Sequence, residues 1–139
     1  MFSFEAWWQI LTTKLPVFFQ GVGTTVELAL YTAIFGTLLG IVVALLRMSK
    51  IKVLKVLAGV YIEFLRGTPL LVQVLIVFYG LPQMGIKLPR LTAGTVALVI
   101  NSAAYMAEIV RSGIQAIDGG QTEASRSLGM NGFQTMIYI

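Results

Sequence analysis

Four polar side chains recur at helical spacing within an apolar segment of this sequence. Asn101, Tyr105, Glu108 and Ser112 follow one another at i, i+4, i+7 and i+11, which places them on one face of a helix. Amide, phenol and carboxylate groups can hydrogen-bond a polar solute, and in a membrane helix such groups face the bundle interior or a water-filled path. A helix–helix seam with buried hydrogen bonds explains the same stripe. The spacing therefore predicts either translocation-path lining or a packing seam.

The sequence lacks the residues on which most catalytic and metal chemistry depends. Its 139 residues include no His and no Cys, so the commonest general base and metal ligand and all thiolate chemistry are missing. No Gly-rich phosphate loop ending in Lys-Ser or Lys-Thr occurs either. We therefore expect no catalytic residue, no metal site and no cofactor bound by this chain.

A second group of polar residues surrounds a break in an apolar helical pattern. Glu63 and Arg66 lie three residues apart on one face, where they can pair. Thr68 can then cap a new helix that Pro69 opens. Irregular backbone at this depth must be buried against protein or line a cavity, so we predict one kinked span. The candidate residues are Glu63, Arg66, Gly67 and Pro69 for an intramembrane pair or kink, and Gln73 and Tyr79 for path lining or interhelical hydrogen bonds.

A polar segment over 118–129 stands out in a sequence that is mostly lipid-soluble. Gly120 can serve as an N-cap with Glu123 three residues later, and Gly129 suits the left-handed position after a helix. Asn131 can cap the next helix. A two-turn helix over 121–128 is marginal alone and needs a neighbour; we expect Ala124 and Leu128 to lie on its packed side. A plain re-entry loop and a docking helix fit these residues equally well.

The elements that must position these groups are membrane helices. The sequence is 57% hydrophobic and 12% charged, whereas a soluble domain carries roughly 25% charged residues. About 20 apolar residues in a helix cross a hydrocarbon core of about 30 Å. We predict an all-α, polytopic membrane protein. Its expected segments are spans at about 17–46, 54–81 and 91–111, a loop at 118–132 and the start of a fourth span at 133–139.

The first expected span has two features of its own. An aromatic-rich segment over 1–14 predicts a short interfacial helix, after which Pro16 begins or bends the span. Small residues then recur on one face, which lets another helix approach closely. They are Ala29, Ala33, Gly36 and Gly40.

The distribution of cations predicts the orientation in the membrane. Arg47, Lys50, Lys52 and Lys55 follow the first span within nine residues and without an acid, which marks the cytoplasmic side by the positive-inside rule. We therefore expect the N-terminus outside and the loop at 118–132 in the cytoplasm.

Three motifs in order resemble a known family. The polar segment resembles the EAA loop of bacterial ABC importer permeases, with Ser125 at the motif's second alanine; it reads Gly120-Gln121-Thr122-Glu123-Ala124-Ser125-Arg126-Ser127-Leu128-Gly129. The segments at 64–73 and 101–109 look like the polar amino acid subfamily, whose substrates include histidine, glutamine and arginine. The resemblance covers nearly the whole chain.

The resemblance implies a fold, a set of partners and a location. The fold is the type I ABC importer permease, of which about three of the five transmembrane helices are present. The partners are a second permease subunit (homo- or heterodimer), an extracytoplasmic amino-acid-binding protein and a cytoplasmic ATP-binding subunit that carries the ATP and Mg. The location is the bacterial inner (plasma) membrane. The residues implied in coupling to the ATPase are Gly120, Gln121, Glu123, Ala124, Ser125, Ser127, Leu128 and Gly129.

Two other functions compete with a permease subunit of an amino acid importer. The family continues after this loop through further spanning segments, so we expect the chain to be a fragment or a truncated product. A truncated membrane fragment or assembly protein without transport of its own is the second hypothesis. The polar stripe from Asn101 to Glu108 allows a third, a small channel.

Overall fold

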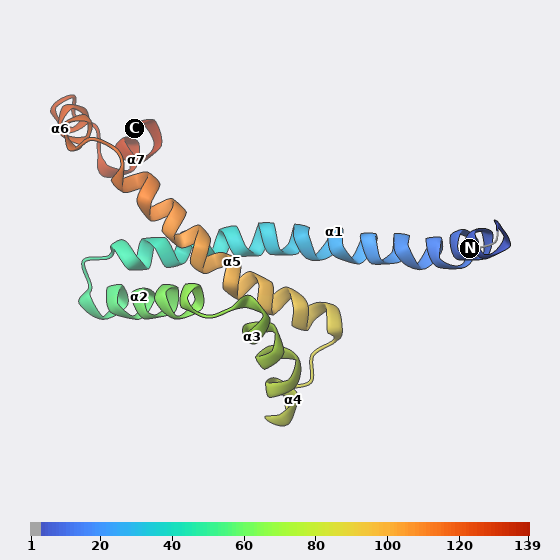
Figure 1. Cartoon of the computed structure of the whole chain (residues 1–139). Coiled ribbons are helices and arrows are strands. Elements are labelled where there is room, and N and C mark those ends of the chain that lie inside the picture. The colour runs from blue at the N-terminus through green and yellow to red at the C-terminus, as the bar shows by residue number, and fades with distance from the viewer. Residues whose placement is uncertain (1–3) are drawn as a thin grey trace.

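Residues 4–139 are described by a computed structural model, in which they form helices joined by short connections (Figure 1). This confirms the all-α prediction. The helices in chain order are α1 (Phe4–Met48), α2 (Lys52–Gly67), α3 (Leu70–Leu75), the π-helix η1 (Ile76–Gly80), α4 (Leu81–Gln83), α5 (Arg90–Gln115), α6 (Gly119–Ser127) and α7 (Gly132–Tyr138).

The first helix is one continuous element of 45 residues with Pro16 inside it. The prediction of a separate interfacial helix that ends before Pro16 is therefore wrong over the described residues, while residues 1–3 lie outside them. Proline removes one backbone hydrogen bond, but membrane helices tolerate this loss. The helix therefore begins well before the predicted start of the first span.

Within residues 4–139, two helices are long and apolar enough to cross a membrane. They cover Trp7–Met48 and Arg90–Gln115, and α2 with the α3–α4 segment makes a third if that bent pair is one span. The two parts of the pair are bent by 104° at the break, and their assignment to one kinked span stays a prediction. Thr68 is extended at the break (φ −110°, ψ 141°), because the ring of Pro69 disfavours helical backbone in the residue before it.

The helices α1 and α5 cross at a close contact that small residues allow. A Cβ atom added at Gly36 would lie 2.9 Å from the Ser102 hydroxyl oxygen, and one added at Gly40 would lie 2.6 Å from the Met106 Cβ. The contact at Gly40 is far inside van der Waals distance of a Cβ that cannot rotate away, so glycine is required there, whereas the added atom at Gly36 meets a serine hydroxyl that would have to shift. The predicted small-residue face is confirmed at these two positions, where it packs against α5.

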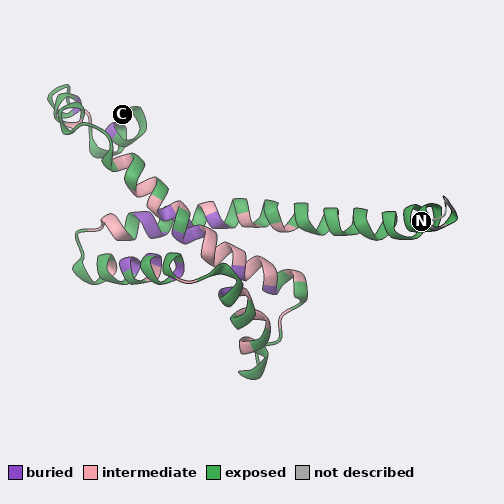
Figure 2. Cartoon of the chain, in the orientation of Figure 1, coloured by how far each residue is buried: buried purple, intermediate pink, exposed green. Residues whose placement is uncertain are grey.

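The buried core lies where α1, α2 and α5 meet. Figure 2 shows its residues grouped at this crossing, while the N-terminal half of α1 is exposed along its length. The cluster is apolar and contains three alanines, whose small side chains let the three backbones approach closely. Its members are Val43, Ala44, Ala58, Ile62 and Ala107.

Candidate translocation and coupling sites

The polar stripe of α5 lies beside the main helix seam and not within it. The buried residues of α5 are all alanines, and Ala107 belongs to the core cluster with α1 and α2. Asn101 and Glu108 are half-buried, and Tyr105 is 46% exposed. On the α5 side, the seam with α1 is therefore formed by alanines together with Ser102 and Met106, and a role of the stripe in path lining stays a prediction.

Asn101 is tied to the break between α2 and α3 through Gln73. The Asn101 amide nitrogen donates to Gln73 Oε1 at 3.1 Å. Gln73 Nε2 lies 2.8 Å from the Leu65 carbonyl oxygen and 2.8 Å from Thr68 Oγ1. With 8% of its surface exposed, Gln73 is a buried interhelical residue. This contact realises one of the two roles that the sequence offered for it, whereas Tyr79 in η1 is 66% exposed.

Thr68 closes the end of α2 instead of opening the next helix. Its hydroxyl donates to the Phe64 carbonyl oxygen at 3.0 Å, and α3 has Pro69 at its N-cap without a side-chain cap. The predicted capping role of Thr68 in the second helix is therefore wrong. The last turn of α2 has free carbonyl groups that need donors, and Thr68 and Gln73 supply them.

The predicted pair between Glu63 and Arg66 is replaced by two tertiary contacts. Glu63 lies 3.6 Å from the Arg47 guanidinium of α1, and the Arg66 guanidinium lies 5.5 Å from the centre of the Tyr105 ring. An i,i+3 pair on a helix surface contributes only a few tenths of a kcal/mol. Contacts with the neighbouring helices α1 and α5 therefore form in place of the local Glu63–Arg66 pair.

Two further charged contacts flank the stripe at the α6 end of α5. Arg111 pairs with Glu108 and also donates to the Gln115 side chain. Arg47 crosses from α1 to donate to the Lys55 carbonyl oxygen of α2 at 3.1 Å, and its guanidinium occupies the space where Gly59 lacks a side chain.

The polar segment after α5 forms the helix α6, which begins at Gly119, two residues earlier than predicted. Asp118 is its N-cap: the Asp118 carboxylate accepts from the Gly120 amide at 2.7 Å. The predicted N-cap at Gly120 is therefore wrong, because Asp118 offers a stronger side-chain acceptor than glycine can. Gly129 has φ of +81°, as predicted for the residue that ends this helix.

One hydroxyl pair joins α6 to α7. Ser125 and Thr135 lie 3.0 Å apart through their side-chain oxygens, and Ser125 is 2% exposed. Ala124 is exposed and Leu128 is 82% exposed, so the prediction that these two residues form the packed side is wrong. The helix turns its small polar residue inward because Thr135 offers a hydrogen-bond partner there.

The other residues implied in coupling lie on the open surface of this loop. Each is exposed, so a partner can reach it without rearrangement of α6. They are Gly120, Gln121, Glu123, Ala124, Ser127, Leu128 and Gly129. Asn131 caps α7 in a reciprocal capping box with Gln134 at 2.9 Å, as its position before the next helix predicts.

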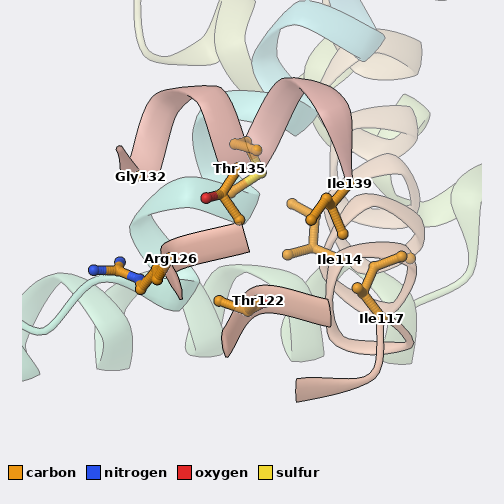
Figure 3. A pocket seen from close by; sticks show the side chains of 9 residues that line it. Ile114, Ile117, Thr122, Arg126, Gly132, Thr135 and Ile139 are labelled. Carbon is orange, nitrogen blue, oxygen red and sulfur yellow. The ribbon is translucent and has the colours of Figure 1, made fainter. Parts of the chain in front are cut away.

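A pocket of about 370 Å³ separates the end of α5 from α6 and α7 (Figure 3). Ile114, Ile117 and Ile139 line its apolar side, while Arg126 and Thr135 lie along the other (Figure 3). The α6–α7 segment is thus joined to α5 by a short connection, and the space between them is partly open.

Several contacts at these sites could not be predicted from local sequence patterns. The cation cluster that includes Arg47 predicts membrane orientation, but Arg47 also bridges α1 and α2. Tyr61 donates to the Ile100 carbonyl oxygen at 2.7 Å, a contact between residues far apart in the chain. Gly59 was the one available signal, because a glycine inside a regular helix suggests close approach of another group.

Residues 36–139 match the family described as the binding-protein-dependent transport system inner membrane component. A probable amino-acid ABC transporter permease protein of Bacillus subtilis, YckA, is 41% identical over 135 residues, which are 94% of this chain and 60% of that protein. The arginine transport system permease protein ArtQ of the same organism is 42% identical over 118 residues, covering 84% and 54%.

A solved structure is also similar over almost the whole chain. It is described as the "Crystal structure of an amino acid ABC transporter with histidines" and matches with a TM-score of 0.85 at 46% identity, covering 99% of this chain and 63% of that one. The chain therefore spans about 60% of the length of these similar proteins. The match over residues 36–139 shows that the chain belongs to the family of binding-protein-dependent transport system inner membrane components.

Proposed function

We propose that this chain acts in a permease subunit of an ATP-binding cassette importer for amino acids. The observation that carries the proposal is the similarity over 99% of the chain to an amino acid ABC transporter, at 46% identity and a TM-score of 0.85. Relatives described as amino-acid permeases support the same substrate class. In this function the chain forms part of the translocation path, and a separate ATP-binding subunit hydrolyses ATP.

The helix α6 is the proposed contact with the ATP-binding subunit. Its ends are well defined by the Asp118 cap and by Gly129, and its outward residues Glu123 and Leu128 are exposed. A short helix that is held at both ends presents a rigid shape to a partner and loses little entropy on docking.

The proposed orientation places α6 in the cytoplasm. Arg47, Lys50, Lys52 and Lys55 lie at or near the connection between α1 and α2, and such clusters stay on the cytoplasmic side. α5 then returns across the membrane from the outside and delivers α6 to the same side. An extracytoplasmic amino-acid-binding protein and a second permease subunit complete the proposed assembly.

The polar stripe of α5 is the proposed lining of the path. Tyr105 and Glu108 are accessible beside the alanine seam, and polar groups on a membrane helix lie where water or a polar solute can reach them. Replacement Glu108→Gln in the complete transporter is expected to lower the uptake rate several-fold more than the amount of assembled protein, with Glu5→Gln, outside the stripe, as control. Equal loss of both quantities would assign Glu108 to packing.

A matched pair of glycine variants tests the coupling contact. Gly129 and Gly85 both have positive φ, +81° and +87°, and neither has an atom within 4 Å of an added Cβ. Valine at either position therefore carries similar backbone strain, about 1–3 kcal/mol. Only Gly129 adjoins α6; Gly85 lies in the connection before α5 on the opposite side.

The experiment measures amino acid uptake and co-purification of the ATP-binding subunit from membranes that hold the complete transporter. We expect Gly129→Val to lose both and Gly85→Val to retain both. Retention of ATP-driven uptake by Gly129→Val and by Glu123→Lys would contradict the coupling role. Ion conductance in planar bilayers without ATP would favour the channel instead.

A further inference from the structure

The break between α2 and α3 carries more polar contacts than its own closure requires. At a helix end the last carbonyl groups lack partners within the helix, and Pro69 cannot supply an N–H group. Thr68 already donates to the Phe64 carbonyl oxygen at 3.0 Å. Gln73 adds the bond to the Leu65 carbonyl oxygen at 2.8 Å, which satisfies a second group.

The Gln73 side chain is shared between the break and α5. Its Nε2 faces three acceptors of the break, since the Thr68 carbonyl oxygen lies at 3.2 Å in addition to Thr68 Oγ1 and the Leu65 oxygen at 2.8 Å. Its Oε1 is the group left for α5, and it accepts from Asn101 at 3.1 Å. A primary amide has two N–H donors and one carbonyl acceptor, so both ends of Gln73 are occupied. A rotation of this amide would break both sets of bonds together.

Two more contacts connect α2 to the same part of α5, one from the middle of α2 and one from its last turn. The Tyr61 hydroxyl donates to the Ile100 carbonyl oxygen at 2.7 Å, one residue before Asn101. The Arg66 guanidinium lies over the Tyr105 ring, one turn after Asn101, at 5.5 Å from its centre. α2 and the break therefore contact α5 at residues 100, 101 and 105, at the first turn of the polar stripe.

We propose that Gln73 is a positioning residue for translocation, which couples the angle of the α2–α3 break to the orientation of Asn101 on the α5 stripe. This inference rests on the proposed import function. Because one buried amide serves both elements, a change in the break during the transport cycle changes the direction of the Asn101 side chain, and the reverse also holds. The break and the stripe thus respond as one unit.

The test separates the two ends of the Gln73 amide. Asn101→Ala removes the bond to α5 and leaves the bonds inside the break, whereas Gln73→Leu removes both. The matched control is Gln83→Leu, the same replacement at an exposed glutamine of α4. Each variant is placed in the complete transporter and reconstituted in vesicles. Uptake rate per assembled complex, substrate concentration at half-maximal rate and ATP hydrolysis with and without substrate are then measured.

We expect Asn101→Ala and Gln73→Leu each to lower the maximal uptake rate about fivefold to tenfold, as the loss of one buried hydrogen bond predicts. The double variant should fall no further than Gln73→Leu alone, because both changes remove the same coupling. ATP hydrolysis should become less dependent on substrate. The Gln83→Leu control should behave as the unmodified protein does.

Three results would overturn the inference while leaving the import function in place. The first is normal uptake per complex by Asn101→Ala. The second is additive loss in the double variant. The third is a fall only in the amount of assembled complex, which a merely structural role of Gln73 predicts. Absence of uptake by the unmodified protein would instead contradict the import function itself.

Discussion

The crossing of α1 with α5 is closely packed, whereas the junction of α6 with α7 has few buried contacts. At the crossing, Gly36 and Gly40 leave just enough room for the Ser102 and Met106 side chains of α5, so the two helices pack closely. At the junction, one pair of hydroxyls, Ser125 and Thr135, is the principal buried contact beside a pocket of about 370 Å³. A densely packed interior resists displacement of its helices, whereas a region with few buried contacts opens at a low free-energy cost. The first region therefore acts as a rigid frame, and the second as a part that can shift when a partner binds.

The largest effect should come from filling the crossing at Gly40. The added methyl group in Gly40→Ala meets the Met106 Cβ at 2.6 Å and the Ala103 carbonyl oxygen at 3.1 Å, and neither is the free end of a flexible side chain. We expect a loss of about 2–3 kcal/mol, seen as a lower thermal unfolding temperature of the purified transporter. Gly21→Ala on the same helix has nothing within 4 Å and should leave this temperature unchanged or slightly raised. Equal effects of the two changes would contradict a close-packed crossing.

A smaller and local effect is expected at the junction. Ser125→Ala removes the bond to Thr135, which still donates to the Asn131 carbonyl oxygen at 3.1 Å. The loss of about 1 kcal/mol should speed amide hydrogen exchange in α6 about fivefold and leave the unfolding temperature of the whole protein unchanged. The control is Ser127→Ala, whose exposed hydroxyl bonds only within its own helix, to the Glu123 oxygen at 3.0 Å. Unfolding of the whole protein by Ser125→Ala would show that the junction belongs to the frame.

The smallest effect should come from Gly59, although an added methyl group there overlaps the Arg47 guanidinium. The overlapped atoms are the end of a long side chain, which can swing aside. The Arg47–Glu63 ion pair faces solvent, with 77% of the Glu63 side chain exposed. Such exposed pairs contribute roughly 0.5 kcal/mol or less to stability. We expect Gly59→Ala to lower the unfolding temperature far less than Gly40→Ala, with Gly67→Ala as the unhindered control. A loss as large as that at Gly40 would mean that Arg47 is held rigidly.

Local rules predicted those features that depend on residues near one another in the chain. The spacing of Gly36 and Gly40 identified a packing face, Gly129 was recognised as a left-handed position, and Asn131 as a helix cap. Each requirement is set by backbone geometry within a few residues. The same reasoning identified a break at Pro69, because proline restricts the residue before it.

Contacts between distant segments could not be predicted in this way. The spacing of Glu63 and Arg66 favours a local pair, but Arg47 and Tyr105 approach from other helices and replace it. Periodicity marked the α5 stripe as polar without showing that alanines form the neighbouring seam. The inward side of α6 was also misjudged, since hydrophobicity favoured Leu128 and a hydroxyl partner in α7 selected Ser125. In these cases, the contact depends on a group that lies far away in the sequence.

The length of α1 has a consequence for how the chain sits in a lipid bilayer. Its 45 residues extend about 67 Å, more than twice a hydrocarbon core of about 30 Å. Even a tilt of about 40° leaves roughly 50 Å along the membrane normal, so tilting alone cannot resolve this hydrophobic mismatch. The exposed aromatic residues Trp7, Trp8, Phe18 and Phe19 favour the headgroup region over water. Part of α1 therefore extends beyond the hydrocarbon core, and Pro16, where a backbone hydrogen bond is already missing, is the position at which the helix would bend at the lowest cost.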